Sequence, residues 1–158
     1  ALKKNELACR CGFCDRAVYP RDAAVVLIDG LYSWGCCAHC AVGVAARTFR
    51  DIEVRQPDAL TGENIVIKTG GGYVISVEPK AAVVWFGQRK AKDGKFVSAG
   101  CFHQAVFANE ENLKKWVETQ PYETGKATTV DQALADKMKM TPGQIKKACK
   151  VGECSVAR

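Results

Sequence analysis

The sequence lacks the features that would place the protein in a membrane or mark it for secretion. No apolar run approaches the roughly 18 residues that a membrane-spanning helix needs, so we predict no membrane span. The first residues, Ala-Leu-Lys-Lys-Asn-Glu, lack the apolar stretch of a signal peptide. The chain also begins without Met, as it would if a leader had been removed. The compartment is therefore left open between the cytoplasm and, after leader removal, the periplasm.

Motifs for phosphate, nucleic-acid and hydrolytic chemistry are missing as well. The three glycines at 70–72 are not followed by Gly-Lys-Ser/Thr, and they predict a tight hairpin rather than a phosphate loop. The net charge of +6 is modest and the lysines are spread out, so we expect no nucleic-acid partner. A Ser-His-Asp arrangement finds no support, and Cys-Ala-His-Cys at 37–40 is followed by Ala41 rather than the histidine of haem attachment.

The remaining pattern predicts an α+β fold, with a small antiparallel or mixed sheet and flanking helices. Apolar and β-branched runs between turn residues predict strands at 23–28, 31–34, 64–69, 73–77 and 81–86. Capping and turn residues predict helices at 37–49, 109–121, 128–138 and from 141 onward. We divide the chain into a Cys-rich knuckle, hairpin and helix (1–50), an α+β core (51–140) and a C-terminal helix with a Cys-containing tail (141–158), together forming one compact unit.

Cysteine is what the chain has in abundance, with nine in 158 residues and six within the first forty. Two Cys-x-x-Cys pairs, at 11–14 and 37–40, have nearly the separation that is typical of a tetrahedral zinc site. We therefore predict a zinc knuckle that staples the N-terminal hairpin. Its ligands are Cys11, Cys14, Cys37 and Cys40.

The other cysteines leave more room for interpretation. Nine is an odd number, and the adjacent Cys36 and Cys37 can form a disulfide only with backbone strain, so metal-bound thiolates suit the clusters better. Cys149 and Cys154 are the best candidates for a disulfide if the compartment is oxidising. The role of Cys9 is left open.

A second soft-metal site is predicted from Cys36 and Cys101, with His103 as a further ligand. Cys101 and His103 are two residues apart in an apolar segment, so on a strand they would share one face. The ordinary alternative for both is burial in the core, where free cysteine in particular is common. His39, inside the second Cys-x-x-Cys, is equally a ligand or a bystander.

Several segments resemble the organomercurial (alkylmercury) lyase family. Residues 76–84 and 99–108, the helix with Leu113 and Trp116, and Val-Asp-Gln-Ala at 130–133 resemble the C-terminal core of these enzymes. The resemblance puts Cys101 on a catalytic cysteine and Cys37 on the cysteine of the family's Cys-x-x-Asp segment, with Cys40 where the aspartate is expected. The N-terminal half is also similar to zinc-binding knuckles and to the copper chaperones of nitrous-oxide reductase, which share a fold relationship with the lyases.

We interpret the chain as a protein that captures or transfers a soft metal ion, namely zinc, copper(I) or mercury, on cysteine thiolates. The expected cofactor is a structural Zn²⁺, with Cu⁺ or Hg²⁺ as the ion that is handled. The expected partners are the metal ion and a protein that receives it.

Two alternatives remain, and whether the protein is an enzyme stays open. The resemblance implies an alkylmercury lyase that breaks carbon–mercury bonds by protonolysis with Cys37 and Cys101 as the thiolate pair. Without an aspartate at position 40, the acid would have to be His39, His103 or a remote carboxylate such as Asp15. The other alternative is an interaction module with one structural zinc and no chemistry.

Overall fold

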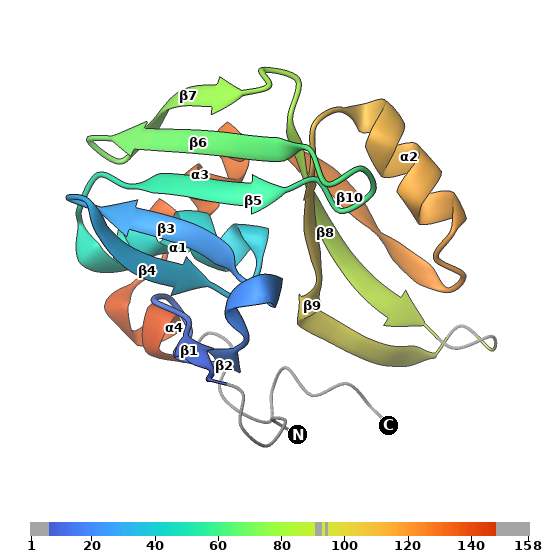
Figure 1. Cartoon of the computed structure of the whole chain (residues 1–158). Coiled ribbons are helices and arrows are strands. Elements are labelled where there is room, and N and C mark those ends of the chain that lie inside the picture. Colours follow the sequence, from blue (N-terminus) through green and yellow to red (C-terminus); the bar gives the residue numbers. More distant parts are fainter. Residues whose placement is uncertain (1–6, 91–92, 94, 148–158) are drawn as a thin grey trace.

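The computed structural model describes residues 7–90, 93 and 95–147, and the predicted α+β class is confirmed (Figure 1). The strands are β1 (Cys9–Arg10), β2 (Ala17–Val18), β3 (Ala24–Ile28), β4 (Leu31–Gly35), β5 (Glu53–Pro57), β6 (Asn64–Gly70), β7 (Tyr73–Glu78), β8 (Val83–Lys90), β9 (Phe96–Phe107) and β10 (Glu123–Thr129). The helices are the 3-10 turn η1 (Pro20–Asp22) and α1 (Ala38–Thr48), α2 (Glu110–Glu118), α3 (Val130–Met138) and α4 (Pro142–Lys147). Among the described residues, no helix combines the length and the apolar character needed to cross a membrane.

A five-stranded antiparallel sheet, in the order β4-β3-β5-β6-β7, forms the larger half of the molecule. Asp29 and Gly30 both have positive φ, 50° and 77°, and form the β3–β4 turn, a conformation that Asp-Gly pairs favour in hairpins. Apolar side chains alternate along the strands, and Val26 and Val54 are almost fully buried beneath the helices. One face of this sheet therefore packs against the hydrophobic core.

Helices α1 and α3 lie behind this sheet in Figure 1 and pack against each other. Residues 38–46 of α1 are all buried, in agreement with the buried helix predicted at 37–49. Small residues make this possible, because they let the helix approach its neighbours closely on every side. The N-terminus of α1, which carries the second Cys-x-x-Cys, is thereby buried.

The smaller half is a three-stranded antiparallel sheet in the order β10-β8-β9, with α2 packed against it (Figure 1). The sheet and α2 enclose a small core of Val83, Trp85, Phe107 and Leu113. The larger core cluster includes buried residues from Cys11 to Ile145, and so draws on all three predicted parts of the chain.

Strands β1, β2 and β9 were not predicted as strands, and β5 and β10 have no counterpart among the predicted elements either. Both are polar: β5 reads Glu-Val-Arg-Gln-Pro and β10 reads Glu-Thr-Gly-Lys-Ala-Thr-Thr. Strand β5 forms because β3 and β6 pair with it on both edges, and β10 forms along the edge of β8. Pairing with neighbouring strands outweighs the weak local preference in both cases.

Asp58 links the two halves, although it lies in the loop after β5. Its carboxylate accepts hydrogen bonds from Ala108 N–H (2.7 Å) and Asn112 Nδ2 (2.9 Å), which belong to the β9–α2 junction. The N–H groups of Leu60 and Thr61 donate to its other oxygen. Burial alone would raise the pKa of Asp58, but these hydrogen bonds hold it below the ordinary value of 3.8.

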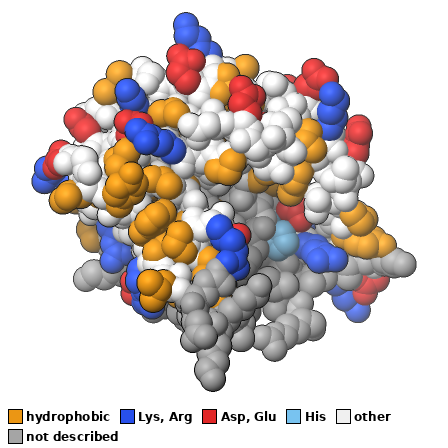
Figure 2. All heavy atoms as spheres, in the orientation of Figure 1, with side chains coloured by type: hydrophobic (Ala, Val, Ile, Leu, Met, Phe, Trp, Pro, Cys, Tyr) orange, Lys and Arg blue, Asp and Glu red, His pale blue; other side chains and the backbone are white. Residues whose placement is uncertain are grey.

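One face of the molecule combines dispersed charge with a hydrophobic area. On the face drawn in Figure 2, blue and red side chains are interspersed, and hydrophobic side chains gather over the part that carries β3 and β4. In that hairpin Leu31 and Tyr32 are 73% and 67% exposed. Nothing in the structure indicates what would cover them.

Candidate thiolate metal centre

The first Cys-x-x-Cys forms a tight turn between β1 and β2. Cys11 N–H donates to Arg16 O (2.9 Å), which closes the turn. Gly12 N–H donates to Trp34 O (2.7 Å), which attaches the turn to β4. Cys11 and Cys14 are consequently buried, at 2% and 9% exposure, rather than displayed on a surface loop.

Phe13, between these cysteines, fixes the turn against α1. Its side chain is fully buried, and a Cβ placed on Gly43 of α1 would come within 2.8 Å of the ring. Arg47 donates a hydrogen bond to Phe13 O, and Lys137 Nζ of α3 lies 4.6 Å from the ring centroid. The glycine in α1 therefore allows the close approach that brings the first pair of cysteines to the helix.

The second group of cysteines lies where β4 ends and α1 begins. Cys37 is the N-cap of α1, and its Sγ accepts a hydrogen bond from Cys40 N–H at 3.3 Å. Its backbone is extended (φ −156°, ψ 172°), so the side chains of Cys36 and Cys37 leave the chain in different directions. One residue can therefore reach the first cysteine pair while the other faces elsewhere.

Cys101 comes from an irregular part of β9. Strand pairing with β8 runs from Phe86–Gln104 directly to Gln88–Ala99, so the segment that contains Cys101 bulges opposite Gly87. Such bulges redirect side chains out of the regular strand alternation. Cys101 is buried, and its Sγ lies 3.7 Å from Cys40 Sγ.

The sulfur atoms form two groups in which every pair lies within 4.8 Å. The first group is Cys11, Cys14, Cys36 and Cys40, and the second group is Cys36, Cys37, Cys40 and Cys101. Cys14 Sγ and Cys36 Sγ are 3.5 Å apart, too far for a disulfide bond. Cys36 and Cys40 belong to both groups.

The grouping differs from the predicted one in the places of Cys36 and Cys37, in the sharing of Cys36 and Cys40, and in a second group without His103. Cys36 completes the group with Cys11 and Cys14, whereas the sequence placed Cys37 there. Cys37 instead joins Cys101. The adjacent positions of Cys36 and Cys37 could have indicated this arrangement. Consecutive side chains on an extended backbone point in different directions and can therefore belong to two sites.

The thiols differ in acidity. Hydrogen bonds from Cys101, Cys36 and Cys40 hold the pKa of Cys37 well below its usual range, which favours the thiolate form. Contact with Cys14 would raise the pKa of Cys11, but hydrogen bonds with Cys36 and Cys40 outweigh it and lower the value to about 6. The pKa of Cys36 is raised, mainly through its contact with Cys101.

A cavity of about 620 Å³ opens onto part of this centre. Its lining includes Cys36, Cys37 and Cys101, but not Cys11, Cys14 or Cys40. The rest of the wall comes from the β2–η1 segment and from two glutamines, and consists of Arg16, Ala17, Val18, Tyr19, Asp22, Gln56 and Gln104. The second group is therefore open to the cavity.

Asp22, which was not among the predicted site residues, is one of the residues of this wall, and its carboxylate lies 3.7 Å from Arg21 Nε. The segment Tyr19-Pro20-Arg21-Asp22 indicates a turn, but no local feature says that the turn covers cysteines. Asp15, one of the acids considered from the sequence, is not among the lining residues. It forms an exposed ion pair with Arg10 at 2.8 Å, which lowers its pKa.

Neither histidine is a member of the two sulfur groups found among the described residues. His103 Nδ1 is 2.9 Å from Glu123 Oε2, and Trp85 Nε1 donates to the other oxygen of Glu123 (3.4 Å). His39 is buried against the ring of Phe86, and its Nε2 has no hydrogen-bond partner. Burial lowers the pKa of His39 to about 4, so the ring is neutral at pH 7 and cannot donate as an imidazolium.

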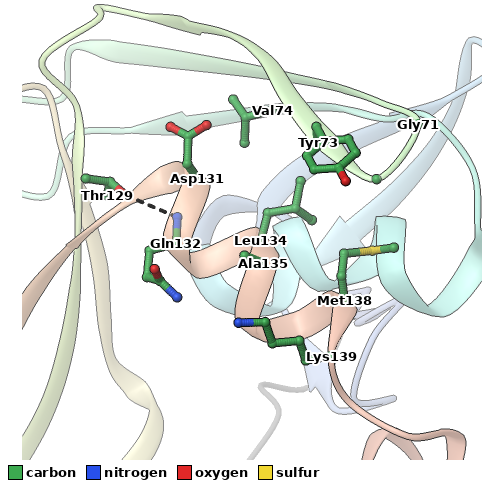
Figure 3. A pocket seen from close by; sticks show the side chains of 11 residues that line it. Gly71, Tyr73, Val74, Thr129, Asp131, Gln132, Leu134, Ala135, Met138 and Lys139 are labelled. Carbon is green, nitrogen blue, oxygen red and sulfur yellow. Dashed lines mark hydrogen bonds between the residues drawn. The ribbon is translucent and has the colours of Figure 1, made fainter.

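A second depression, of about 480 Å³, lies between the β6–β7 turn and α3 (Figure 3). It shares no lining residue with the cavity at the cysteines. One of its polar groups caps α3, because Thr129 Oγ1 accepts a hydrogen bond from Gln132 N–H. No thiol lines it, so the chemistry of the described residues is concentrated at the cysteines.

Comparison with known proteins identifies the family. The family model for alkylmercury lyase (MerB) matches residues 23–140, which is most of the chain. A solved structure, the mercury-bound form of MerB2, shares the fold with a TM-score of 0.63 at 22% identity, and the match covers 78% of this chain and 57% of that one. A search of curated proteins finds no match. The resemblance found in the sequence is confirmed, and the chain belongs to the alkylmercury lyase family.

Proposed function

We propose that this protein captures organomercurials on Cys37 and Cys101 and cleaves the carbon–mercury bond. One observation carries the proposal: both sulfurs belong to one group and both line the same cavity, within the stretch that matches the alkylmercury lyase model. Thiolates are the ligands that soft cations prefer. The cavity gives a bound organic group space beside the sulfurs.

The reaction balances without an oxidant or reductant. R–Hg⁺, one thiolate and one thiol give R–H and a neutral mercury bis-thiolate. Two Hg–S bonds and one C–H bond form, while the C–Hg bond and one S–H bond break. The proton that leaves the second sulfur is the one that reaches carbon.

The two sulfurs suit different parts of this reaction. Cys37, whose pKa is depressed, supplies the thiolate that first binds mercury. Its position at the N-terminus of α1 also favours negative charge. Cys101 then supplies the second sulfur and its proton, and Asp22 is the carboxylate of the cavity wall that can relay the proton.

Capture of a soft metal ion without bond cleavage is the second candidate. It is favoured by Cys40, which stands where the family's aspartate is expected and lies 3.7 Å from Cys101 Sγ. A further sulfur beside the pair favours tight coordination, and a closed thiolate set leaves no position for a substrate. Membership of the alkylmercury lyase family weighs toward cleavage.

Hydrocarbon release separates the candidates. The protein is incubated with methylmercury or phenylmercury and excess small-molecule thiol, and methane or benzene is measured by gas chromatography. We expect repeated turnover that is abolished in Cys37→Ser and in Cys101→Ser. Cys9→Ser is the matched control, because Cys9 lies outside both sulfur groups and its Sγ donates to Val18 O. Tight mercury binding with no hydrocarbon would establish capture instead.

The role of Asp22 is tested separately. Asp22→Asn keeps the size of the side chain and removes its acidity. We expect mercury binding to be unchanged and hydrocarbon release to fall about 100-fold, the lower end of the range for general acid–base groups. An unchanged rate would exclude Asp22 and leave the thiol proton as the direct source.

A further inference from the structure

The sharing of two sulfurs between the groups has a specific geometric meaning. Two tetrahedral ions that each take four thiolates need eight ligands if the sites are separate, but six if the tetrahedra share an edge. The two groups contain six cysteines in total, and Cys36 and Cys40 are common to both. The remaining cysteines divide into two terminal pairs, Cys11 with Cys14 and Cys37 with Cys101.

The sulfur separations agree with such a centre. Metal–sulfur bonds of about 2.3 Å at tetrahedral angles put neighbouring sulfurs about 3.8 Å apart. Cys14 Sγ–Cys36 Sγ, in the first group, is 3.5 Å, and Cys40 Sγ–Cys101 Sγ, in the second, is 3.7 Å. Each of these contacts joins a terminal cysteine to a shared one, and every other sulfur pair within a group is separated by at most 4.8 Å.

Each terminal pair is held in place by a different part of the fold. The turn at 11–14 is fixed by backbone hydrogen bonds and by Phe13 packing on Gly43. Cys37 is fixed as the N-cap of α1, and the bulge in β9 delivers Cys101. The shared cysteines lie between them, one before α1 and one in its first turn.

The two groups differ in their access to solvent. Three members of the second group line the cavity, whereas the first group reaches the cavity only through the shared Cys36. Closed four-thiolate sites are typical of structural ions, and accessible sites are typical of exchangeable ones. The family match also divides them, because it begins at residue 23 and so contains the second group but not the turn at 11–14.

We propose that the six cysteines form a binuclear thiolate centre. A resident divalent ion of the zinc type is held by Cys11, Cys14, Cys36 and Cys40. A second, exchangeable soft ion is held by Cys37 and Cys101 and shares the sulfurs of Cys36 and Cys40. Identification of the second ion as the mercury of the substrate rests on the proposed function, while the resident ion and the shared sulfurs do not.

The resident ion also gives Cys40 a role that differs from that of an aspartate. With its sulfur committed to the first ion, Cys40 no longer acts as a free third thiol beside the substrate. Cys37 and Cys101 then remain as the pair that is open to the cavity. The resident ion thus separates the reactive pair from the surrounding cysteines.

The first experiment counts and couples the ions, with cadmium as the probe. Protein is purified without added metal, analysed for zinc by mass spectrometry, and then titrated with ¹¹³Cd²⁺ under reducing conditions. We expect about one equivalent of zinc as purified and two of cadmium at saturation. The two ¹¹³Cd resonances should show mutual scalar coupling through the shared sulfurs. Two uncoupled resonances, or saturation at one equivalent, would overturn the proposal.

Variants assign the positions. Cys14→Ser should lose the resident zinc, and Cys101→Ser should keep the zinc but lose the second cadmium. Cys36→Ser should disturb both resonances, and Cys9→Ser should change neither. If Cys36→Ser fails to fold, the coupling in the unmodified protein and the two terminal variants still decide the question. Loss of only one ion in a folded Cys36→Ser would also overturn the sharing.

These results are independent of the hydrocarbon assay. Coupled ions with no methane or benzene would remove the lyase proposal and leave the binuclear centre intact. Hydrocarbon release from a protein that holds a single metal position would do the reverse.

Discussion

The two halves of the molecule assemble their chemical groups in different ways. Five cysteines from the turn at 11–14 and the start of α1 in the larger half converge with Cys101 from the bulged β9 of the smaller half, and the direct contacts between their sulfurs are weak. In the smaller half, His103, Glu123 and Trp85 lie across the ladder of β9, β8 and β10 and hydrogen-bond one another. In the smaller half Glu123 hydrogen-bonds both His103 and Trp85, whereas the cysteine groups gather sulfur ligands that suit a metal ion.

Metal removal should therefore separate the halves most strongly. A structural zinc contributes on the order of 10 kcal/mol to folding in small zinc domains. Chelation should abolish amide-exchange protection at residues 9–18 and 31–48 and leave residues 83–107 and 123–129 protected. Hydrogen exchange followed by mass spectrometry measures both. Equal protection of both halves with and without the chelator would show that packing alone holds the cysteines.

The next largest effect is expected from Glu123, which belongs to the other half. Glu123→Ala removes the buried acceptor of His103 and Trp85, and should lower the free energy of unfolding by about 2–4 kcal/mol. Metal content should not change. Glu123→Gln retains an oxygen acceptor and should lose less, as measured by urea denaturation. A loss of metal in the folded Glu123→Ala protein would contradict the separation of the two halves.

Asp58 tests the connection between the halves, and its effect depends on pH. Asp58→Asn weakens the hydrogen bonds to Ala108 and Asn112 and should cost about 1–3 kcal/mol at pH 7. The pKa of Asp58 is lower in the folded state, so its ionisation stabilises the fold above pH 3.8. That stability is lost as the pH falls through the folded pKa. The difference in the free energy of unfolding between the unmodified protein and Asp58→Asn should therefore be smaller at pH 3 than at pH 7, as measured by denaturation. An equal difference at both pH values would contradict this account.

The smallest change in stability should come from a substitution of Gly43, which tests how packing holds the cysteines in place. Gly43→Ala places a methyl group 2.8 Å from the Phe13 ring, so the turn at 11–14 must shift. We expect about 1–2 kcal/mol of destabilisation, partly offset by the better helix propensity of alanine, with weaker metal retention against a chelator. Gly143→Ala has room for the methyl group and is the control. Equal metal retention in both variants would show that the turn tolerates the shift.

Much of the larger half could be predicted from local sequence. The Asp-Gly turn fixes the β3–β4 hairpin, and small apolar residues predict the buried α1. The capping residues Asn109 and Thr129 mark the starts of α2 and α3, where their side chains accept the expected backbone hydrogen bonds. Strands β5 and β10 could not be found in this way, because their polar sequences become strands only through pairing with neighbours.

Clustered thiolate chemistry could be predicted from the sequence alone, because the cysteine spacing and the motifs of the family are visible in short segments of the chain. The sequence also determined the α+β class, since strand and helix periodicities are read within single segments. The division of the sulfurs into two groups could be seen only in the folded structure. The direction of each cysteine side chain depends on the start of α1 at Cys37 and on the bulge of β9 that carries Cys101. The tertiary structure also decided that His103 faces Glu123 and that Asp22 reaches the cavity, since both depend on contacts between segments far apart in the chain.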